Sequence, residues 1–218
     1  MAIKAIIFDM DGVLVDTETY KFLATKELIK KYKDAELTPE RFRKYVGMHI
    51  NDIAIELQYE FHFEWNPEEF AEEREAGYRK IRDEKGIKGF PNTIKFLKAI
   101  DKKKYRIGLA SSSTKEDINQ VLTVLGIRQY FDVVMSCDDV EASKPDPAIY
   151  LKTAEKLGLK PSECLVIEDT HAGVVAGTEA GMKVIAVPNE WTKEQDLSRA
   201  IRIVSGLKEI RLDQLDRF

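Results

Sequence analysis

The chain has 218 residues, of which 44% are hydrophobic and 33% are charged, and 34 basic against 38 acidic residues give a net charge of −4. This composition suits a folded globular chain and excludes a disordered or collagen-like one. The apolar runs are short and the two signs of charge are mixed along the sequence. These features argue against a membrane-spanning role and against binding to nucleic acid or to an anionic membrane.

The N-terminal sequence and the cysteines favour the cytoplasm. Met1-Ala2-Ile3-Lys4 leads directly into an apolar segment and lacks the pattern of a secretory signal. Cys137 and Cys164 are far apart in the sequence, so neither a disulfide framework nor a cysteine zinc site is expected. We expect a cytoplasmic protein that is a monomer or a weak homo-oligomer.

Short apolar segments alternate with helical patterns along most of the chain. Strands are predicted at residues 3–8, 105–110, 132–135, 164–167 and 183–187, with a short edge strand at 200–204. Helices are predicted between them, over residues 114–125, 146–157 and 170–180. Continuously apolar strands that alternate with helices are typical of a sheet covered on both faces. The predicted fold is therefore α/β, a doubly wound, Rossmann-like parallel sheet.

A long helical stretch interrupts this alternation after the first strand. Thr38-Pro39-Glu40 and Asn66-Pro67-Glu68 each look like a helix N-cap followed by proline at the first helical position. Residues 18–32 are predicted to carry an apolar stripe made of Phe22, Leu23, Leu28, Ile29 and Tyr32. Because loops that join a strand to a helix are usually short, we predict a small helical domain of residues 16–88. It is inserted by two linkers, near Val15-Asp16 and residues 86–91, into a core of residues 1–15 and 89–218.

Polar residues follow four of the predicted strands, at the carboxyl ends where parallel α/β sheets bind ligands. Two aspartates this close in sequence need a cation or a proton between them. Serine hydroxyls beside free backbone N–H groups can bind phosphate. A lysine near the aspartates can neutralise a nucleophile and a phosphoryl oxygen together. Further acidic residues suit Mg²⁺, which prefers oxygen ligands. In chain order, the four groups are Asp9-Met10-Asp11-Gly12, Ser111-Ser112-Ser113, Ser143-Lys144-Pro145-Asp146-Pro147 and Glu168-Asp169.

Each group taken alone also has a purely structural explanation. Asp and Gly favour turns, the serines form a polar loop before a helix cap, a lone lysine is usually solvated, and acidic residues stabilise a helix N-terminus. These explanations would have to coincide at four strand ends. Their joint placement therefore favours phosphoryl-transfer chemistry.

In the order and spacing of these motifs, and over nearly its whole length, the chain resembles the haloacid dehalogenase-like (HAD) hydrolase superfamily. Within it, the chain most resembles the β-phosphoglucomutase-like and sugar-phosphate phosphatase branch, and the helical insertion stands where that family has its cap domain. The resemblance implies that Asp9 is the nucleophile that forms an aspartyl-phosphate, and that Asp11 is the general acid and base. It further implies that Mg²⁺ is held by Asp9, the backbone carbonyl of Asp11 and Asp169, with Glu168 close by or acting through water. The phosphoryl group would be bound by Ser111 and Lys144, and Ser112 is a further candidate for this role.

The insertion is the part of the chain expected to select the substrate. Gly47-Met48-His49-Ile50 resembles the specificity loop of the family, and His49 is a candidate substrate contact. The mutase branch carries an arginine where this chain has Ile50 and a histidine where it has Lys21. We therefore expect a phosphatase acting on a small phosphorylated metabolite, such as a sugar or polyol phosphate. The alternatives are a β-phosphoglucomutase-type phosphomutase and, less favoured, a non-enzymatic phospho-accepting signalling module.

Overall fold

The computed structural model describes residues 2–62 and 64–217, and the chain divides into two compact units. The core unit comprises Met1–Asp16 and Lys88–Phe218, and the helical unit comprises Thr17–Ile87. Each boundary lies one residue from the expected one. The two connecting segments run side by side within the core unit, because Val15 forms an antiparallel bridge with Gly89.

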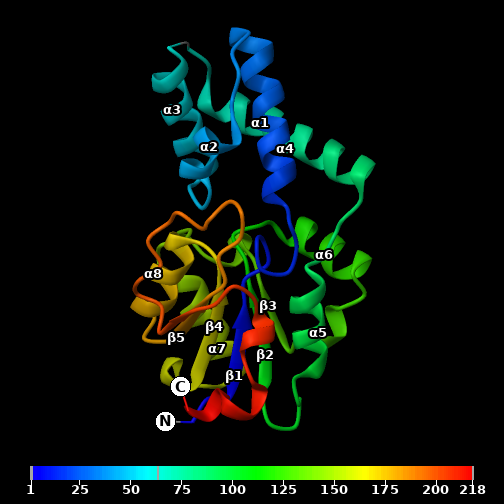
Figure 1. Ribbon diagram of the computed structural model, residues 1–218, viewed down its shortest axis with the longest axis vertical. Helices are drawn as coiled ribbons and strands as arrows, with labels where there is room; N and C mark the ends of the chain where they lie inside the picture. Colours follow the sequence, from blue (N-terminus) through cyan, green and yellow to red (C-terminus); the bar gives the residue numbers. More distant parts are fainter. Residues whose placement is uncertain (1, 63, 218) are drawn as a thin grey trace. The chain divides into compact units, whose positions relative to one another are not determined.

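Six parallel strands form the sheet of the core unit, in the order β3-β2-β1-β4-β5-β6 (Figure 1). β1 lies at the centre, with Ala5 paired to Arg106 of β2 and to Cys164 of β4. Five strands lie inside the segments predicted for them, whereas β4 continues one residue further, to Glu168, which pairs with Ala186. The strands are β1 (Ala5–Phe8), β2 (Arg106–Ala110), β3 (Val133–Met135), β4 (Cys164–Glu168), β5 (Lys183–Ala186) and β6 (Arg202–Ile203).

Helices cover both faces of this sheet, as the sequence predicts. Successive residues of a strand point to opposite faces, so Ile7 joins the apolar core formed with α7 and α8. Phe8 instead meets Phe96 of α5, edge to face, with 6.3 Å between ring centroids. The helices are α5 (Pro91–Ala99), α6 (Lys115–Val124), α7 (Ala148–Leu157) and α8 (His171–Glu179), and the 3-10 turns are η2 (Arg128–Tyr130), η3 (Cys137–Asp139), η4 (Pro161–Glu163), η5 (Leu207–Glu209) and η6 (Leu212–Arg217).

Several helices of the core unit begin or end at residue types that favour helix ends. The Thr114 side chain accepts a hydrogen bond from the Asp117 N–H at the start of α6, and Gly158 ends α7 with a φ of 70°. α7 begins two residues later than predicted, because the Asp146 carboxylate accepts from the Ala148 N–H and holds the preceding residues in a turn.

The helical unit contains α1 (Glu18–Lys33), α2 (Pro39–Phe42), η1 (Arg43–Tyr45), α3 (Ile50–Phe61) and α4 (Pro67–Lys85). Residues 17–62 and 64–87 form helices and turns without any strand (Figure 1). Tyr20 and Ala24 of α1 pack against Tyr78 and Ile81 of α4. Tyr32 is wrongly included in the predicted apolar stripe: it is 42% exposed, and its hydroxyl donates to Glu73.

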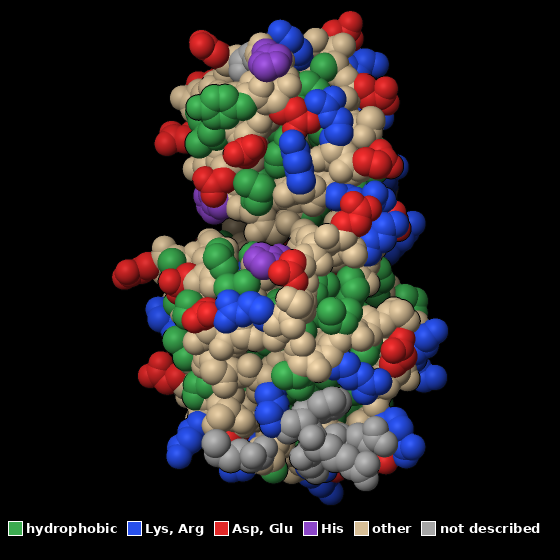
Figure 2. All heavy atoms as spheres, turned by 60° about the vertical axis from the view of Figure 1, so that its left-hand side comes forward, with side chains coloured by type: hydrophobic (Ala, Val, Ile, Leu, Met, Phe, Trp, Pro, Cys, Tyr) green, Lys and Arg blue, Asp and Glu red, His purple; other side chains and the backbone are tan. Residues whose placement is uncertain are grey.

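The surface carries charge of both signs. In Figure 2, acidic and basic side chains are interspersed over the visible face of each unit. Within residues 2–62 and 64–217, no helix is long and apolar enough to cross a membrane.

The N-cap of α4 provides a test of how this unit is stabilised. The Asn66 side chain accepts hydrogen bonds from the backbone N–H groups of Glu68 and Glu69, at 2.8 and 3.3 Å. We expect Asn66→Ala to lower the free energy of unfolding by about 1 kcal/mol, measured by urea denaturation followed by circular dichroism. The control is Asn119→Ala, at an exposed position within α6. Equal effects of the two substitutions would contradict the capping role.

Candidate functional site

The backbone fixes where the polar strand ends lie. Beyond β1, the N–H of Asp9 donates to the carbonyl of Ile167, at 3.0 Å, and beyond β2 the N–H of Ser111 donates to Met135, at 3.1 Å. At the end of β4, the carbonyl of Glu168 accepts from Val187, at 2.7 Å. Sheet hydrogen bonding thus extends past the regular strands, and all these ends lie at one edge because the strands are parallel.

Three carboxyl groups meet at this edge. Asp9, Glu168 and Asp169 each offer one oxygen, and these oxygens lie within 4.8 Å of one another. The three residues are 6%, 1% and 1% exposed, respectively. Segments about 160 residues apart in the chain therefore converge as the sequence predicts.

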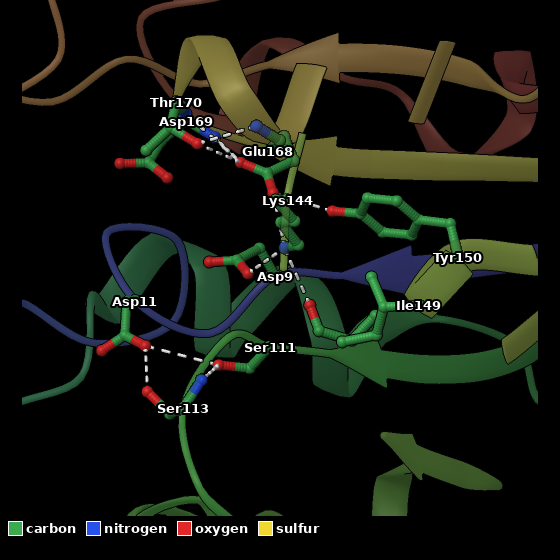
Figure 3. A network of polar contacts seen from close by, with 12 residues as sticks. Asp9, Asp11, Ser111, Ser113, Lys144, Ile149, Tyr150, Glu168, Asp169 and Thr170 are labelled. Carbon is green, nitrogen blue, oxygen red and sulfur yellow. Dashed lines mark hydrogen bonds and ion pairs between the residues drawn. The ribbon is translucent and has the colours of Figure 1, made fainter. Parts of the chain in front are cut away.

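Lys144 links two of these acids. Its ammonium donates to Asp9 Oδ1 at 2.6 Å, to Glu168 Oε1 at 2.7 Å and to the carbonyl of Ala110 at 3.1 Å. In Figure 3 it lies between the two carboxylates. Tyr150 of α7 donates its hydroxyl to the same Glu168 oxygen, at 2.7 Å, and its ring centroid lies 4.8 Å from the ammonium. The lysine is thus a buried ion-pair partner rather than a solvated surface residue.

Burial and charge act on the pKa values of this cluster in opposite directions. Burial raises the pKa of Asp9 well above its usual range, and the carboxylates of Glu168 and Asp11 add to the rise that Lys144 opposes. Burial also disfavours the charged forms of Lys144 and Glu168. The charges of Asp9 and Glu168 outweigh burial at Lys144, so that its pKa is raised, and the charge and hydrogen bond of Lys144 outweigh burial at Glu168, so that its pKa is lowered.

The second oxygen of Glu168 serves the N-terminus of α8. Glu168 Oε2 accepts from the backbone N–H groups of Asp169 and Thr170, at 2.9 and 3.2 Å, and from the Thr170 hydroxyl, at 3.2 Å. A carboxylate is favoured at this end of a helix. Glu168 therefore has both roles that the sequence leaves open: it stabilises a helix N-terminus and belongs to the acidic cluster.

The carboxylate of Asp11 is turned toward the serine loop. Its Oδ2 accepts from the Ser113 hydroxyl at 2.6 Å and from the Ser111 hydroxyl at 3.4 Å (Figure 3). Ser111 is fully buried, whereas Ser112 is exposed. The third serine of this loop, rather than the second, thus contacts Asp11, and phosphate binding by Ser112 remains a prediction. Coordination of a metal through the Asp11 carbonyl remains a prediction.

His49 belongs to the helical unit and caps α3. It is exposed, and its Nδ1 accepts from the backbone N–H of Asn51, at 3.4 Å. A structural role as N-cap is therefore present, and substrate contact by His49 remains a prediction.

Three residues at the site are not among the predicted binding residues. Ser113 belongs to the serine loop, and Tyr150 lies in the helix predicted over residues 146–157, where its spacing is that of an ordinary core position. Asn189 donates to Asp169 Oδ2 at 2.7 Å. It follows β5, so the rule that singled out the four other strand ends could have found it.

The donor set of the acidic cluster fits a divalent cation. Lys144 pairs with Asp9 and Glu168, and Asp169 is the third buried carboxyl group of the cluster. Buried charges are costly unless they are paired, and Mg²⁺ takes oxygen ligands of this kind. The backbone at Gly12 leaves room for the Asp169 carboxylate, because a Cβ atom at Gly12 would lie 2.0 Å from Asp169 Oδ2. Asp9, Glu168 and Asp169 are therefore the residues that would hold the ion.

Gly173 supplies a test of how closely the cluster is packed. A Cβ atom at this position would lie 1.8 Å from Glu168 Oε1. Helix propensity alone favours alanine over glycine by about 1 kcal/mol, but such a contact forces Glu168 to move. We expect Gly173→Ala to lower the melting temperature and to weaken Mn²⁺ binding, measured by calorimetric titration.

The matched control is Gly206→Ala, because Gly206 has an extended φ of 170° and a Cβ atom there meets nothing within 4 Å. This variant should behave like the wild type. Wild-type stability and Mn²⁺ affinity in Gly173→Ala would refute the packing argument.

Comparisons with known proteins agree with this geometry. The chain matches the model of the haloacid dehalogenase-like hydrolase family over residues 6–187. It is 35% identical to the YhcW protein of Bacillus subtilis over 191 residues, which cover 87% of this chain and 86% of the relative. It is 31% identical to the phosphorylated carbohydrates phosphatase of Thermotoga maritima over 182 residues, covering 84% and 83% of the two chains.

A solved structure extends the likeness to the fold. β-Phosphoglucomutase from Clostridium difficile is 27% identical and has a TM-score of 0.81, with 99% of this chain and 96% of that chain covered. A non-enzymatic signalling module is contradicted by this family match. The chain belongs to the haloacid dehalogenase-like hydrolase family, and it is an enzyme of the hydrolase class.

Proposed function

We propose that this protein is a Mg²⁺-dependent phosphatase that hydrolyses a small phosphomonoester, of the sugar or polyol phosphate class, through an aspartyl-phosphate. The observation that carries the proposal is the contact of Asp9 with Lys144, beside Glu168 and Asp169, at one edge of the sheet. A carboxylate nucleophile, a buried cation and an acidic pair are what phosphoryl transfer from an ester requires.

In the first step, a carboxylate oxygen of Asp9 attacks phosphorus, and the bond from phosphorus to the ester oxygen breaks. The leaving alkoxide takes a proton from Asp11, which lies two residues further along the same chain segment. Lys144 keeps its proton, because the neighbouring carboxylates raise its pKa, and it offsets negative charge on the transferred group.

In the second step, water attacks the phosphorus of the aspartyl-phosphate. Asp11, now deprotonated, takes a proton from this water, the bond from phosphorus to the Asp9 oxygen breaks, and inorganic phosphate leaves. The Ser113 hydroxyl donates to Asp11 Oδ2 at 2.6 Å and so helps to orient this carboxylate. Ser111, fully buried at the end of β2, is our candidate for binding the phosphoryl oxygens together with Lys144.

When bound, Mg²⁺ would supply charge neutralisation for the phosphoryl oxygens and the acidic cluster. The substrate class is supported by the Thermotoga maritima relative, which is named a phosphatase of phosphorylated carbohydrates. We assign substrate selection to the helical unit, with His49 as a candidate contact.

A phosphomutase is the second candidate, favoured by the likeness to β-phosphoglucomutase. It would use the same first step and return the phosphoryl group to another hydroxyl of the sugar. Ile50 and Lys21 stand where the mutase branch carries an arginine and a histidine, and this favours hydrolysis.

Removal of divalent cations is the first test. With a panel of sugar and polyol phosphates, we expect phosphate release in the presence of Mg²⁺, its loss in EDTA and its return when Mg²⁺ is added in excess. Undiminished release in EDTA would contradict the metal requirement. Conversion of β-glucose 1-phosphate to the 6-phosphate without phosphate release would establish the mutase instead.

The nucleophile gives the second test. An amide cannot attack phosphorus, so Asp9→Asn should fold and yet release phosphate only at the background rate. Asp132→Asn is a matched control, because Asp132 accepts from the N–H of Ile107 away from the acidic cluster. This control should retain turnover. Wild-type rates in a folded Asp9→Asn variant would rule out the mechanism.

A further inference from the structure

The loop after β5 adds a fifth strand end to the site. Asn189 lies in this loop, three residues beyond the end of β5 at Ala186, and is partly buried. Its side-chain amide donates to Asp169 Oδ2 at 2.7 Å and to the carbonyl oxygen of Gly12 at 3.1 Å. A single side chain thus connects the loop after β5 to the acid that follows β4 and to the turn that follows β1.

Neighbouring backbone groups fix the orientation of this amide. Asn189 Oδ1 accepts from the N–H of Trp191 at 2.8 Å, so the amide oxygen is directed toward its own loop and the NH₂ group toward Asp169. Both acceptors of the NH₂ group are oxygens, and a flipped amide would place oxygen against oxygen at both contacts. The arrangement therefore permits one orientation of the side chain.

The loop that carries Asn189 is itself held in place. The Asn189 N–H donates to the hydroxyl of Thr192 at 3.1 Å, and the Asn189 carbonyl accepts from the N–H groups of Thr192 and Lys193 at 3.2 and 3.0 Å. Thr192 is fully buried. The donor that faces Asp169 is thus preorganised by its own turn.

Gly12 shows how closely these groups approach. A Cβ atom at this position would lie 2.0 Å from Asp169 Oδ2 and 2.8 Å from the amide nitrogen of Asn189. The absence of a side chain at Gly12 leaves space for the pair. Asn189 in turn ties the Gly12 carbonyl, and with it the turn that carries the catalytic aspartates, to Asp169.

We propose that Asn189 is a positioning residue for the divalent cation: by holding Asp169 Oδ2 and the Gly12 turn, it sets the direction in which Asp169 presents its carboxylate to the ion. This inference rests on the proposed function, since it concerns the same acidic cluster. Hydrogen-bonded partners of metal ligands commonly change metal affinity or activity by about 10- to 100-fold when they are removed.

A purely structural role in the loop is the competing explanation, and the chain offers variants that separate the two. Asn189→Ala removes every side-chain contact. Asn189→Ser keeps a hydroxyl that can accept from the N–H two residues on, and so keeps the turn, but loses both donations. Thr192→Val disturbs the same turn while leaving the amide of Asn189 in place.

The experiment is a calorimetric titration of the metal-free full-length protein with Mn²⁺, without substrate, together with melting curves in EDTA. We expect Asn189→Ala and Asn189→Ser to raise the Kd for Mn²⁺ by about 10-fold or more. Thr192→Val keeps both donations of the Asn189 amide and should therefore raise the Kd for Mn²⁺ by much less than Asn189→Ser does. In turnover assays, Asn189→Ser should need more Mg²⁺ for half-maximal rate and recover most of its rate at saturation.

Wild-type Mn²⁺ affinity in a folded Asn189→Ser variant would overturn the inference, as would an equal loss in Thr192→Val. A wild-type protein that hydrolyses no phosphomonoester, or does so without a divalent cation, would contradict the proposed function. A wild type that binds Mn²⁺ and hydrolyses phosphomonoesters, but whose affinity is unchanged by loss of Asn189, would contradict this inference alone.

Discussion

The burial of three carboxyl groups beside one ammonium is the constraint on which the site depends. The charged form of each of these groups is far better stabilised by water than by a protein interior. They remain at the sheet edge because the fold supplies their partners: the backbone N–H groups at the start of α8 for Glu168, the amide of Asn189 for Asp169, and Lys144 for both Asp9 and Glu168. A divalent cation bound here would favour the ionised forms of these acids, against the burial that raises the pKa of Asp9.

Two residues with no functional group of their own make this arrangement sterically feasible. Gly12 leaves space for Asp169 Oδ2, and Gly173 leaves space for the carboxylate of Glu168. Both contacts would be shorter than 2.5 Å if a Cβ atom were present. Backbone that follows β1 and β4 therefore packs directly against the carboxylates of Asp169 and Glu168. Added bulk at either glycine would displace these carboxylates without removing any functional group.

Much of the fold and most of the site could be predicted from the sequence. Continuous apolarity marks β1 and β4, and the carboxyl ends of parallel strands must share one edge, so the meeting of Asp9 with Glu168 and Asp169 followed from topology. Contacts that depend on the direction of a side chain cannot be predicted from topology in this way. Ser112 and Ser113 are chemically identical in the sequence, and only the loop geometry directs one to solvent and the other to Asp11.

The remaining errors have similar causes. Tyr32 falls on the apolar stripe by its spacing, but its hydroxyl reaches Glu73 and leaves the ring half exposed. Tyr150 also fits a core stripe, and its polar role toward Glu168 appears only when α7 is placed over the sheet. Periodicity predicts which face of a helix is buried. The hydrogen-bond partner of a tyrosine hydroxyl depends instead on which distant segment packs beside the ring, and periodicity does not predict that.

The central claim is that the buried acids form a divalent-cation site, and anomalous diffraction from crystals soaked in Mn²⁺ tests it most directly. The account predicts an anomalous peak bounded by Asp9, Glu168 and Asp169, with Lys144 still in contact with Asp9. Density that contains these side chains as described but shows the anomalous peak elsewhere, or shows none at saturating Mn²⁺, would contradict it.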